Sequence, residues 1–119
     1  MEEKIVFNTE DVSENKVFGI LSYIGILVLI PIFAAKDSQY ARFHSNQGLV
    51  LCIVEIALNI IVRVISFILS FVLGGVILAS LLELAVAVVS LVFMILGIVN
   101  ACSGEAKQLP IIGGVTILK

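Results

Sequence analysis

The stretch that decides the fold is GLVLCIVEIALNIIVRVISFILSFVL at residues 48–73, followed after Gly74 and Gly75 by VILASLLELAVAVVSLVFMILGIVNA at residues 76–101. A helix that crosses a bilayer needs about 20 mostly apolar residues, whereas a buried helix of a soluble protein rarely exceeds about 14. The two runs therefore predict two membrane-spanning helices, and the glycine pair predicts a turn that makes them an antiparallel hairpin. Only three residues within the two runs are charged, namely Glu55, Arg63 and Glu83.

A third apolar run lies nearer the N-terminus, at residues 17–35, between Lys16 and Lys36. At about 1.5 Å per residue it reaches about 28 Å, close to the thickness of a hydrocarbon core. It contains Pro31 and lacks a small-residue cleavage site, so we interpret it as a retained crossing rather than a signal peptide. The predicted fold is all-α, an integral membrane protein with three transmembrane helices. Three small residues of this run could admit a close neighbour: Gly19, Ser22 and Gly25.

Composition and charge agree with a membrane protein of one domain. Hydrophobic residues make up 61% of the 119 residues and charged residues 13%, with a mean hydropathy of +1.21 and a formal net charge of -2. The chain offers no basic patch for a nucleic acid. We expect an acidic flexible tail at residues 1–16, a transmembrane domain at 17–101 and an interfacial tail at 102–119. The expected location of the protein is the cell membrane, as an integral multi-pass protein.

Residues 36–47 are the only substantial polar connection between the predicted spans. Tyr40 and Phe43 are three residues apart, so on a short helix starting after Asp37 or Ser38 they would share a face at headgroup level. The alternative is that Asn46 caps the next spanning helix directly.

His44 lies in this connection without a second histidine, cysteine or carboxylate at metal-ligand spacing. We expect an interfacial polar residue, with a pH-sensitive or ligand-contacting group as the alternative. A membrane-bound enzyme would require a pocket around His44, Asn46 and Gln47. Redox, zinc, dinucleotide and phosphate-binding motifs are missing from the sequence, so we predict no enzyme, no catalytic residue, no cofactor and no metal. Cys52 and Cys102 are expected to be free thiols.

Polar residues recur at helical spacing within the two long runs. The first run carries Glu55, Asn59, Arg63, Ser66 and Ser70 at steps of three or four residues, which places them on one face. The second run carries small and polar residues at similar steps, among them Ser80, Glu83, Ser90 and Gly97. Counting from the glycine turn places Glu83 within about 4.5 Å in height of the position opposite Arg63. The spacing therefore predicts an ion pair between Arg63 and Glu83.

The free energy of membrane insertion indicates that these groups face protein or water. A charge at the bilayer centre costs about 2.5 to 3.5 kcal/mol even on the insertion scale, which gives lower costs than simulations do. Our leading interpretation is a polar seam of Glu55, Asn59, Arg63 and Glu83 in a protein of structural or assembly type. In the alternative, Glu55 is an excess acid that binds a proton or cation in an oligomeric pore or ion pathway with Arg63 and Glu83. The expected partners are the lipid bilayer and a second copy or another membrane protein.

One run of residues supports a family resemblance. Tyr40-Ala41-Arg42-Phe43-His44-Ser45-Asn46-Gln47-Gly48, with Leu21 to Gly25 before it and Ile98 to Ala101 and Leu109 to Gly113 after it, resembles a family of small bacterial membrane proteins. That family is grouped with the twenty-kilodalton translocon subunit, the import component of the chloroplast inner envelope. The resemblance implies an all-helical multi-pass fold and a role near protein translocation. Its most specific residues form a family-motif loop: Arg42, Phe43, His44, Asn46, Gln47 and Gly48.

Overall fold

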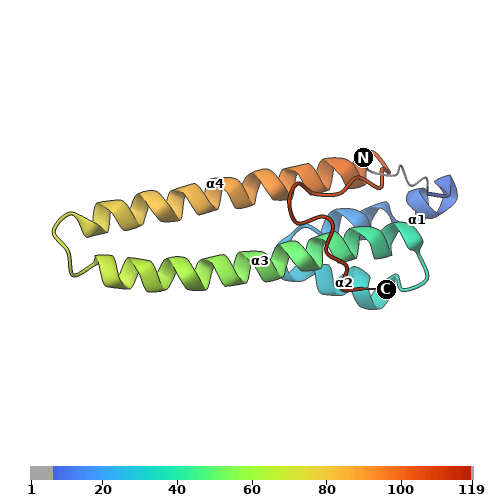
Figure 1. The fold of residues 1–119 in the computed structure, drawn as a ribbon. Helices are drawn as coiled ribbons and strands as arrows, with labels where there is room; N and C mark the ends of the chain where they lie inside the picture. Colours follow the sequence, from blue (N-terminus) through green and yellow to red (C-terminus); the bar gives the residue numbers. More distant parts are fainter. Residues whose placement is uncertain (1–6, 119) are drawn as a thin grey trace.

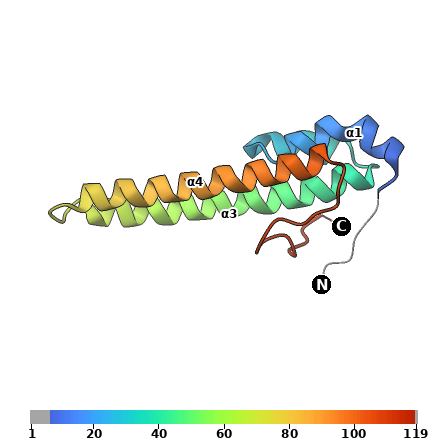
Figure 2. The ribbon, with the colours of Figure 1, turned by 90° about the horizontal axis from the view of Figure 1, so that it is seen from above.

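The computed structural model describes residues 7–118, and within them every regular element is helical. The elements in order are α1 (Thr9–Leu21), a short 3-10 helix η1 (Gly25–Val28), α2 (Leu29–Ala34), α3 (Gln39–Leu69) and α4 (Gly75–Cys102). α3 and α4 lie side by side along the long axis of a molecule of 58 × 30 × 20 Å, and α1 and α2 gather at one end of them (Figure 1, Figure 2). The predicted all-α fold and its hairpin of two long helices are confirmed.

The glycine pair makes the turn of the hairpin, as the sequence predicts. Gly74 has a φ of 76°, in the left-handed region that a residue without Cβ adopts at little steric cost. A Cβ on Gly75 would collide with the carbonyl oxygen of Leu69, so glycine lets the two helix ends approach closely. The helix boundaries differ from the predicted spans, because α3 occupies Gln39–Leu69 rather than 48–73 and α4 occupies Gly75–Cys102 rather than 76–101.

Both long helices suit a bilayer by length, composition and surface. α3 has 31 residues and α4 has 28, yet only 22% and 6% of their most apolar windows are buried inside the protein. Large apolar side chains therefore point outward along the hairpin, among them Ile60 and Phe67 on α3 and Leu84 and Val88 on α4. Such a surface is unfavourable in water and matches hydrocarbon. The chain is a membrane protein with two helices able to cross the bilayer.

The length of α3 separates a bilayer-embedded part from a polar part. Counted back from Leu69 beside the turn, about 20 residues reach Val50 and span a hydrocarbon core of about 30 Å. Residues 39–48 of α3 precede this stretch and pack with α1, η1, α2 and the C-terminal segment. We call this end of the molecule, residues 7–48 and 101–118, the head.

The single spanning helix predicted at residues 17–35 is wrong. α1 already begins at Thr9, where the side chain of Asn8 caps it by accepting a hydrogen bond from the backbone N–H of Glu10. The helix ends at Leu21, and Gly25 takes a φ of 53° at the start of η1. The expected flexible tail is therefore helical from residue 9, while residues 1–6 and 119 lie outside the described residues.

Packing explains this division of the N-terminal run. Ser22 and Tyr23, at the break, are 0% and 2% exposed, and Val28 and Pro31 are buried as well. These four residues pack against the rest of the head, whereas Ile26, Ile30 and Phe33 of the same run are exposed. Pro31 lies in the first turn of α2, where backbone N–H groups have no partner inside the helix, so its ring kinks nothing.

Candidate functional site

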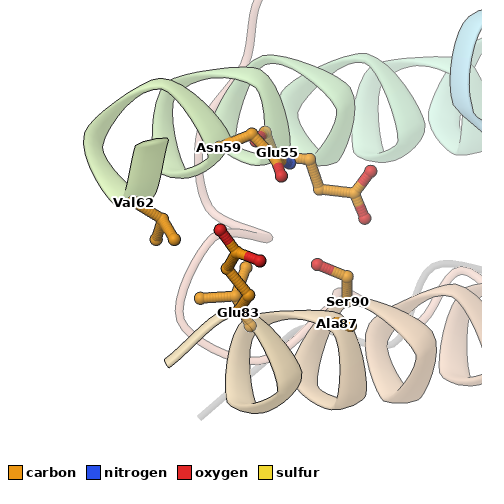
Figure 3. A pocket seen from close by; sticks show the side chains of 7 residues that line it. Glu55, Asn59, Val62, Glu83, Ala87 and Ser90 are labelled. Atoms are coloured by element: carbon orange, nitrogen blue, oxygen red, sulfur yellow. The ribbon is translucent and has the colours of Figure 1, made fainter. Parts of the chain in front are cut away.

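The hairpin encloses a small polar cavity between its two long helices. Figure 3 shows Glu55 and Asn59 of α3 and Glu83 and Ser90 of α4 directed toward the space between the helices. The cavity has a volume of about 200 Å³, and its remaining walls are Val62, Val86 and Ala87. The structure brings three of the four predicted seam residues, Glu55, Asn59 and Glu83, to one cavity, and Arg63 does not line it.

Hydrogen bonds within the seam are few. Ser66 Oγ donates to Glu83 Oε1 at 3.2 Å and so links α3 to α4. Asn59 Nδ2 donates to the carbonyl oxygen of Glu55 at 2.7 Å, one turn back along its own helix. Glu55 is half-buried, whereas Asn59 and Glu83 are exposed. The polar groups of the seam are therefore only partly satisfied within one chain.

The predicted ion pair between Arg63 and Glu83 is not formed within the described chain, although the residues lie at similar heights. The buried side chain of Val62 marks the side of α3 that faces α4. Because each helical residue turns about 100° from the previous one, Arg63 lies about 100° from Val62 and about 40° from Asn59 around the helix, at the edge of the face that lines the cavity. Arg63 is exposed, as are Asn59 and Glu83. The spacing predicted the height of this residue, and the predicted ion pair is not formed.

A second polar cluster lies in the head, where the predicted motif loop is in fact the start of α3. Ser38 caps the helix, since its Oγ accepts from the backbone N–H of Ala41 at 3.0 Å. The predicted helix start after Ser38 is therefore confirmed, but the helix continues as α3 instead of being short, and the alternative of Asn46 as a cap is wrong. Asp11 of α1 completes the cap: its carboxylate accepts from Ser38 Oγ at 2.5 Å and from the backbone N–H of Tyr40 at 3.1 Å. A carboxylate at a helix N-terminus also complements the helix dipole.

Asp11 is a positioning residue that sequence reasoning missed. It belongs to a run of acids that was interpreted as a flexible tail, because nothing near it in the chain indicates a partner 27 residues away. The available signal for a helix was Asn8, a residue type that favours the N-cap position, directly before Thr9 and three residues before Asp11.

His44 is buried in the head rather than exposed at an interface. It is 0% exposed, and its Nδ1 lies 2.5 Å from the hydroxyl of Tyr23. The rings of Tyr40 and Phe43 pack against the imidazole with centroids 4.9 and 5.1 Å away. Nε2 meets no hydrogen-bond partner among the described residues. Burial, and then the nearby Tyr40, raise the pKa of Tyr23, so its hydroxyl stays protonated.

Asn46 and Gln47 hold the C-terminal strap, which we define as residues 104–118. Asn46 Nδ2 donates to the carbonyl oxygen of Val115 at 2.8 Å, and its Oδ1 accepts from the backbone N–H groups of Ile117 and Leu118 at 2.6 and 3.0 Å. Gln47 Nε2 donates to the carbonyl oxygen of Gly113 at 2.8 Å, and its Oε1 accepts from the backbone N–H of Leu109 at 2.9 Å. Two amide side chains thereby supply hydrogen bonds that an irregular strap does not make for itself.

Small residues bring the elements of the head into close contact. A Cβ on Gly48 would collide with the carbonyl oxygen of Ser22, and a Cβ on Gly97 would collide with the ring of Tyr23. Gly19 packs closely on the Tyr40 side chain, whose hydroxyl donates to the carbonyl oxygen of Ala101 at 2.6 Å. Close neighbours are therefore confirmed for Gly19 and Ser22, whereas a Cβ on Gly25 would meet nothing within 4 Å.

Metal-ligating side chains do not gather in either cluster. Across residues 7–118, no group of three or more His, Cys, Asp or Glu residues is placed to hold a metal ion. Cys52 is half-buried and Cys102 is exposed, and both are free thiols, as expected.

Comparison with known proteins corrects the family assignment. A family model described as the magnetosome magnetite crystal formation protein family matches residues 14–116. Magnetosome protein MamF of Paramagnetospirillum magneticum is 39% identical over 54 residues, which cover 43% of this chain and 49% of that protein. Magnetosome protein MamF of Magnetospirillum gryphiswaldense is 50% identical over 30 residues, which cover 25% of this chain and 27% of that protein. The matched segments thus span about half or less of these curated relatives, and no solved structure matches.

The kinship with the chloroplast import component is therefore wrong, and the expected role near protein translocation loses its support. The run at residues 40–48 that suggested it lies inside the matched region 14–116 and is explained by that match. In the structure this run builds the start of α3 and the anchor of the strap, which are requirements of the fold. The chain belongs to the magnetosome magnetite crystal formation protein family.

Proposed function

We propose that this chain is a non-catalytic assembly protein of the membrane in which magnetite crystals form, and that it acts by associating with a second copy of itself through the hairpin. The observation that carries the proposal is Arg63, an exposed cation without an ion pair inside the described chain, on a hairpin whose large exposed side chains are mostly apolar. Arg63 lies about 9 Å from the turn, inside a core of about 30 Å but away from its centre, so facing lipid would cost it at most about 2.5 to 3.5 kcal/mol. A protein partner that offers an acid removes this penalty.

A second copy offers such an acid at the right depth. Arg63 is six residues before the end of α3 and Glu83 eight residues after the start of α4, so they lie about 9 and 12 Å from the turn. A two-fold axis along the membrane normal preserves depth, which brings Arg63 of one protomer level with the partner's Glu83. The interface would thus be self-complementary in charge.

The change Arg63→Ala is expected to weaken dimerisation at least about tenfold, because it removes the cation that neutralises Glu83 across the interface. The measurement is energy transfer between labelled copies in bilayers, titrated over protein-to-lipid ratio. Ser80→Ala is the matched control, since Ser80 is exposed and its hydroxyl bonds only to its own helix at Val76. Equal association of the wild type and Arg63→Ala would contradict the proposal, as would additive effects of Arg63→Gln and Glu83→Gln.

The site of action is testable in a magnetite-forming cell. When the chain is expressed in Paramagnetospirillum magneticum that lacks its MamF, we expect it to purify with magnetically isolated magnetosomes. The support for this expectation is the family match together with the membrane-embedded hairpin. Recovery only in the bulk cell membrane fraction would contradict this part of the proposal.

A proton or cation pathway is a second candidate function, favoured by the cavity that Glu55 and Glu83 line between the helices. Carboxylates placed inside a membrane often mark such pathways. Reconstituted liposomes with an internal pH or cation indicator test it, with Glu55→Gln as the variant expected to reduce flux. Failure to conduct at any pH or in any lipid mixture removes this candidate and leaves the assembly proposal standing.

A further inference from the structure

The divided N-terminal run presents an apolar tip that the proposed assembly function does not use. We define the tip as residues 24–30, which comprise η1, the residue before it and the first two residues of α2. The sequence holds no charged residue between Lys16 and Lys36, on either side of the tip. Large exposed apolar patches mark contacts with a protein or a membrane. The exposed large side chains of the tip are all apolar, namely Ile26, Leu27, Leu29 and Ile30.

Polar groups beside the tip are turned inward, the reverse of what is expected for a turn in water. The hydroxyl of Ser22 donates to the carbonyl oxygen of Phe18 at 2.8 Å, and the hydroxyl of Tyr23 lies against Nδ1 of His44. Both polar side chains are buried, whereas Ile26 in the tip is 72% exposed. Since polar residues of a protein in water are mostly exposed, the outward side of the tip suits an apolar surrounding.

The tip lies at the level where α3 enters the hydrocarbon core. A Cβ on Gly48 would collide with the carbonyl oxygen of Ser22, and Tyr23 belongs to one core cluster with Leu51. At about 1.5 Å per residue, Gly48 lies about 32 Å and Leu51 about 27 Å from Leu69 beside the turn. A hydrocarbon core of about 30 Å therefore ends between them. Both ribbon views place the connection between α1 and α2 at the end of the head nearest the hairpin turn (Figure 1, Figure 2).

The backbone at this bend makes its own hydrogen bonds. The N–H groups of Tyr23, Ile24 and Leu27 donate to carbonyl oxygens three residues earlier, at 3.3, 3.2 and 3.0 Å. Unpaired backbone groups are costly in hydrocarbon, so these bonds make the bend compatible with contact with the bilayer. After the tip, α2 leads back to Ala35, which packs with Tyr40 near the start of α3. The run therefore returns to the side from which it came.

We propose that the tip is a re-entrant segment whose partner is the lipid bilayer. Its exposed side chains insert where the headgroups meet the acyl chains, in the leaflet nearest the head, as the apolar face of an interfacial helix does. The hairpin presents exposed apolar side chains at the same depth, among them Ile53 of α3 and Leu96 of α4. Because lipid surrounds the hairpin, the tip extends its lipid-facing surface and holds the head against the membrane.

Fluorescence quenching of single labelled cysteines tests the proposal in phosphatidylcholine vesicles at low protein-to-lipid ratio. Cys52→Ala and Cys102→Ser remove the natural thiols, and Ile26→Cys or Ile30→Cys then carries the fluorophore on the tip. One quencher is a nitroxide on the lipid acyl chain, and the other is a nickel complex dissolved in the water. Circular dichroism establishes that each variant keeps its helices.

Two exposed positions are the controls: Ser13→Cys on α1 for water and Ile60→Cys on α3 for the core. We expect the ratio of lipid to aqueous quenching for Ile26→Cys to be at least about fivefold higher than for Ser13→Cys. A nitroxide near the glycerol should quench Ile26→Cys more strongly than one near the chain end. The reverse order should hold for Ile60→Cys, which lies about 14 Å from Leu69 and so near the middle of the core.

Three results would overturn the proposal. Stronger quenching by the nickel complex at both tip positions would place the tip in water. Protection from both quenchers would show that a second copy or another protein covers it. Stronger quenching of Ile26→Cys by the deep nitroxide would show that the run penetrates the core instead of stopping at its boundary. The lipid contact of the tip is measured without dimerisation, so this proposal and the assembly proposal fail independently.

Discussion

The change Gly48→Ala is expected to destabilise the head by about 3 kcal/mol, the upper end of the usual cost of overpacking. A Cβ at this position would overlap the carbonyl oxygen of Ser22, which is backbone and cannot rotate away as a side chain could. Relief requires α1 and α3 to separate, and that separation would also disturb the contact between Tyr23 and His44. Unfolding in mixed micelles of mild detergent and SDS, followed by circular dichroism, measures the change.

Gly114→Ala is the control for this prediction. Gly114 lies in the strap with nothing within 4 Å of its would-be Cβ, so the same added methyl group should cost little. If Gly48→Ala and Gly114→Ala unfold at the same SDS fraction, the close approach of α1 to α3 described here is wrong.

The change Gln47→Leu is expected to release the strap. Leucine keeps a similar volume and removes both hydrogen bonds of the amide, leaving the carbonyl oxygen of Gly113 and the N–H of Leu109 buried without partners. Each unsatisfied group costs about 1 to 3 kcal/mol, so a total of about 3 kcal/mol is expected. Trypsin reports the release directly, because Lys107 lies in the strap and should be cleaved much faster in the variant.

Gln39→Leu is the matched control for strap release, since Gln39 belongs to the same helix and is exposed. Its cleavage rate at Lys107 should equal that of the wild type. Equal rates in Gln47→Leu and the wild type would show that the two buried amide hydrogen bonds do not hold the strap.

Hydropathy predicted the hairpin correctly because the features that form it are local. Two long apolar runs and one glycine pair are sufficient to specify two helices and a turn, whatever the rest of the chain does. The run at residues 17–35 has the same composition, yet it is divided because Ser22 and Tyr23 pack against α3 and α4. That contact is tertiary, so no window of sequence could reveal it.

The candidate sites show the same difference between local features, which the sequence reveals, and tertiary contacts, which it does not. Spacing predicted one face for Glu55, Asn59 and Glu83, and these three line one cavity, whereas the position of Arg63 depends on how α3 is rotated against α4. The polarity of residues 39–47 was interpreted as that of a surface connection, since polar residues are usually exposed. Asn46 and Gln47 are instead satisfied by backbone groups 62 to 72 residues later in the chain. An adjacent pair of amides within the third turn of the helix was the one available signal.

The same separation in sequence sets the order of events when the protein is made. Gln47 leaves the ribosome 62 residues before Leu109, an interval of about 3 to 12 s at translation rates of about 5 to 20 residues per second. Until then the amides of Asn46 and Gln47 have no strap to bind. The hydroxyl of Tyr40 likewise binds the carbonyl oxygen of Ala101, which is made 61 residues later. Both apolar helices are complete by Cys102. The hairpin can therefore enter the bilayer first, and the head closes around it afterwards, on the membrane surface.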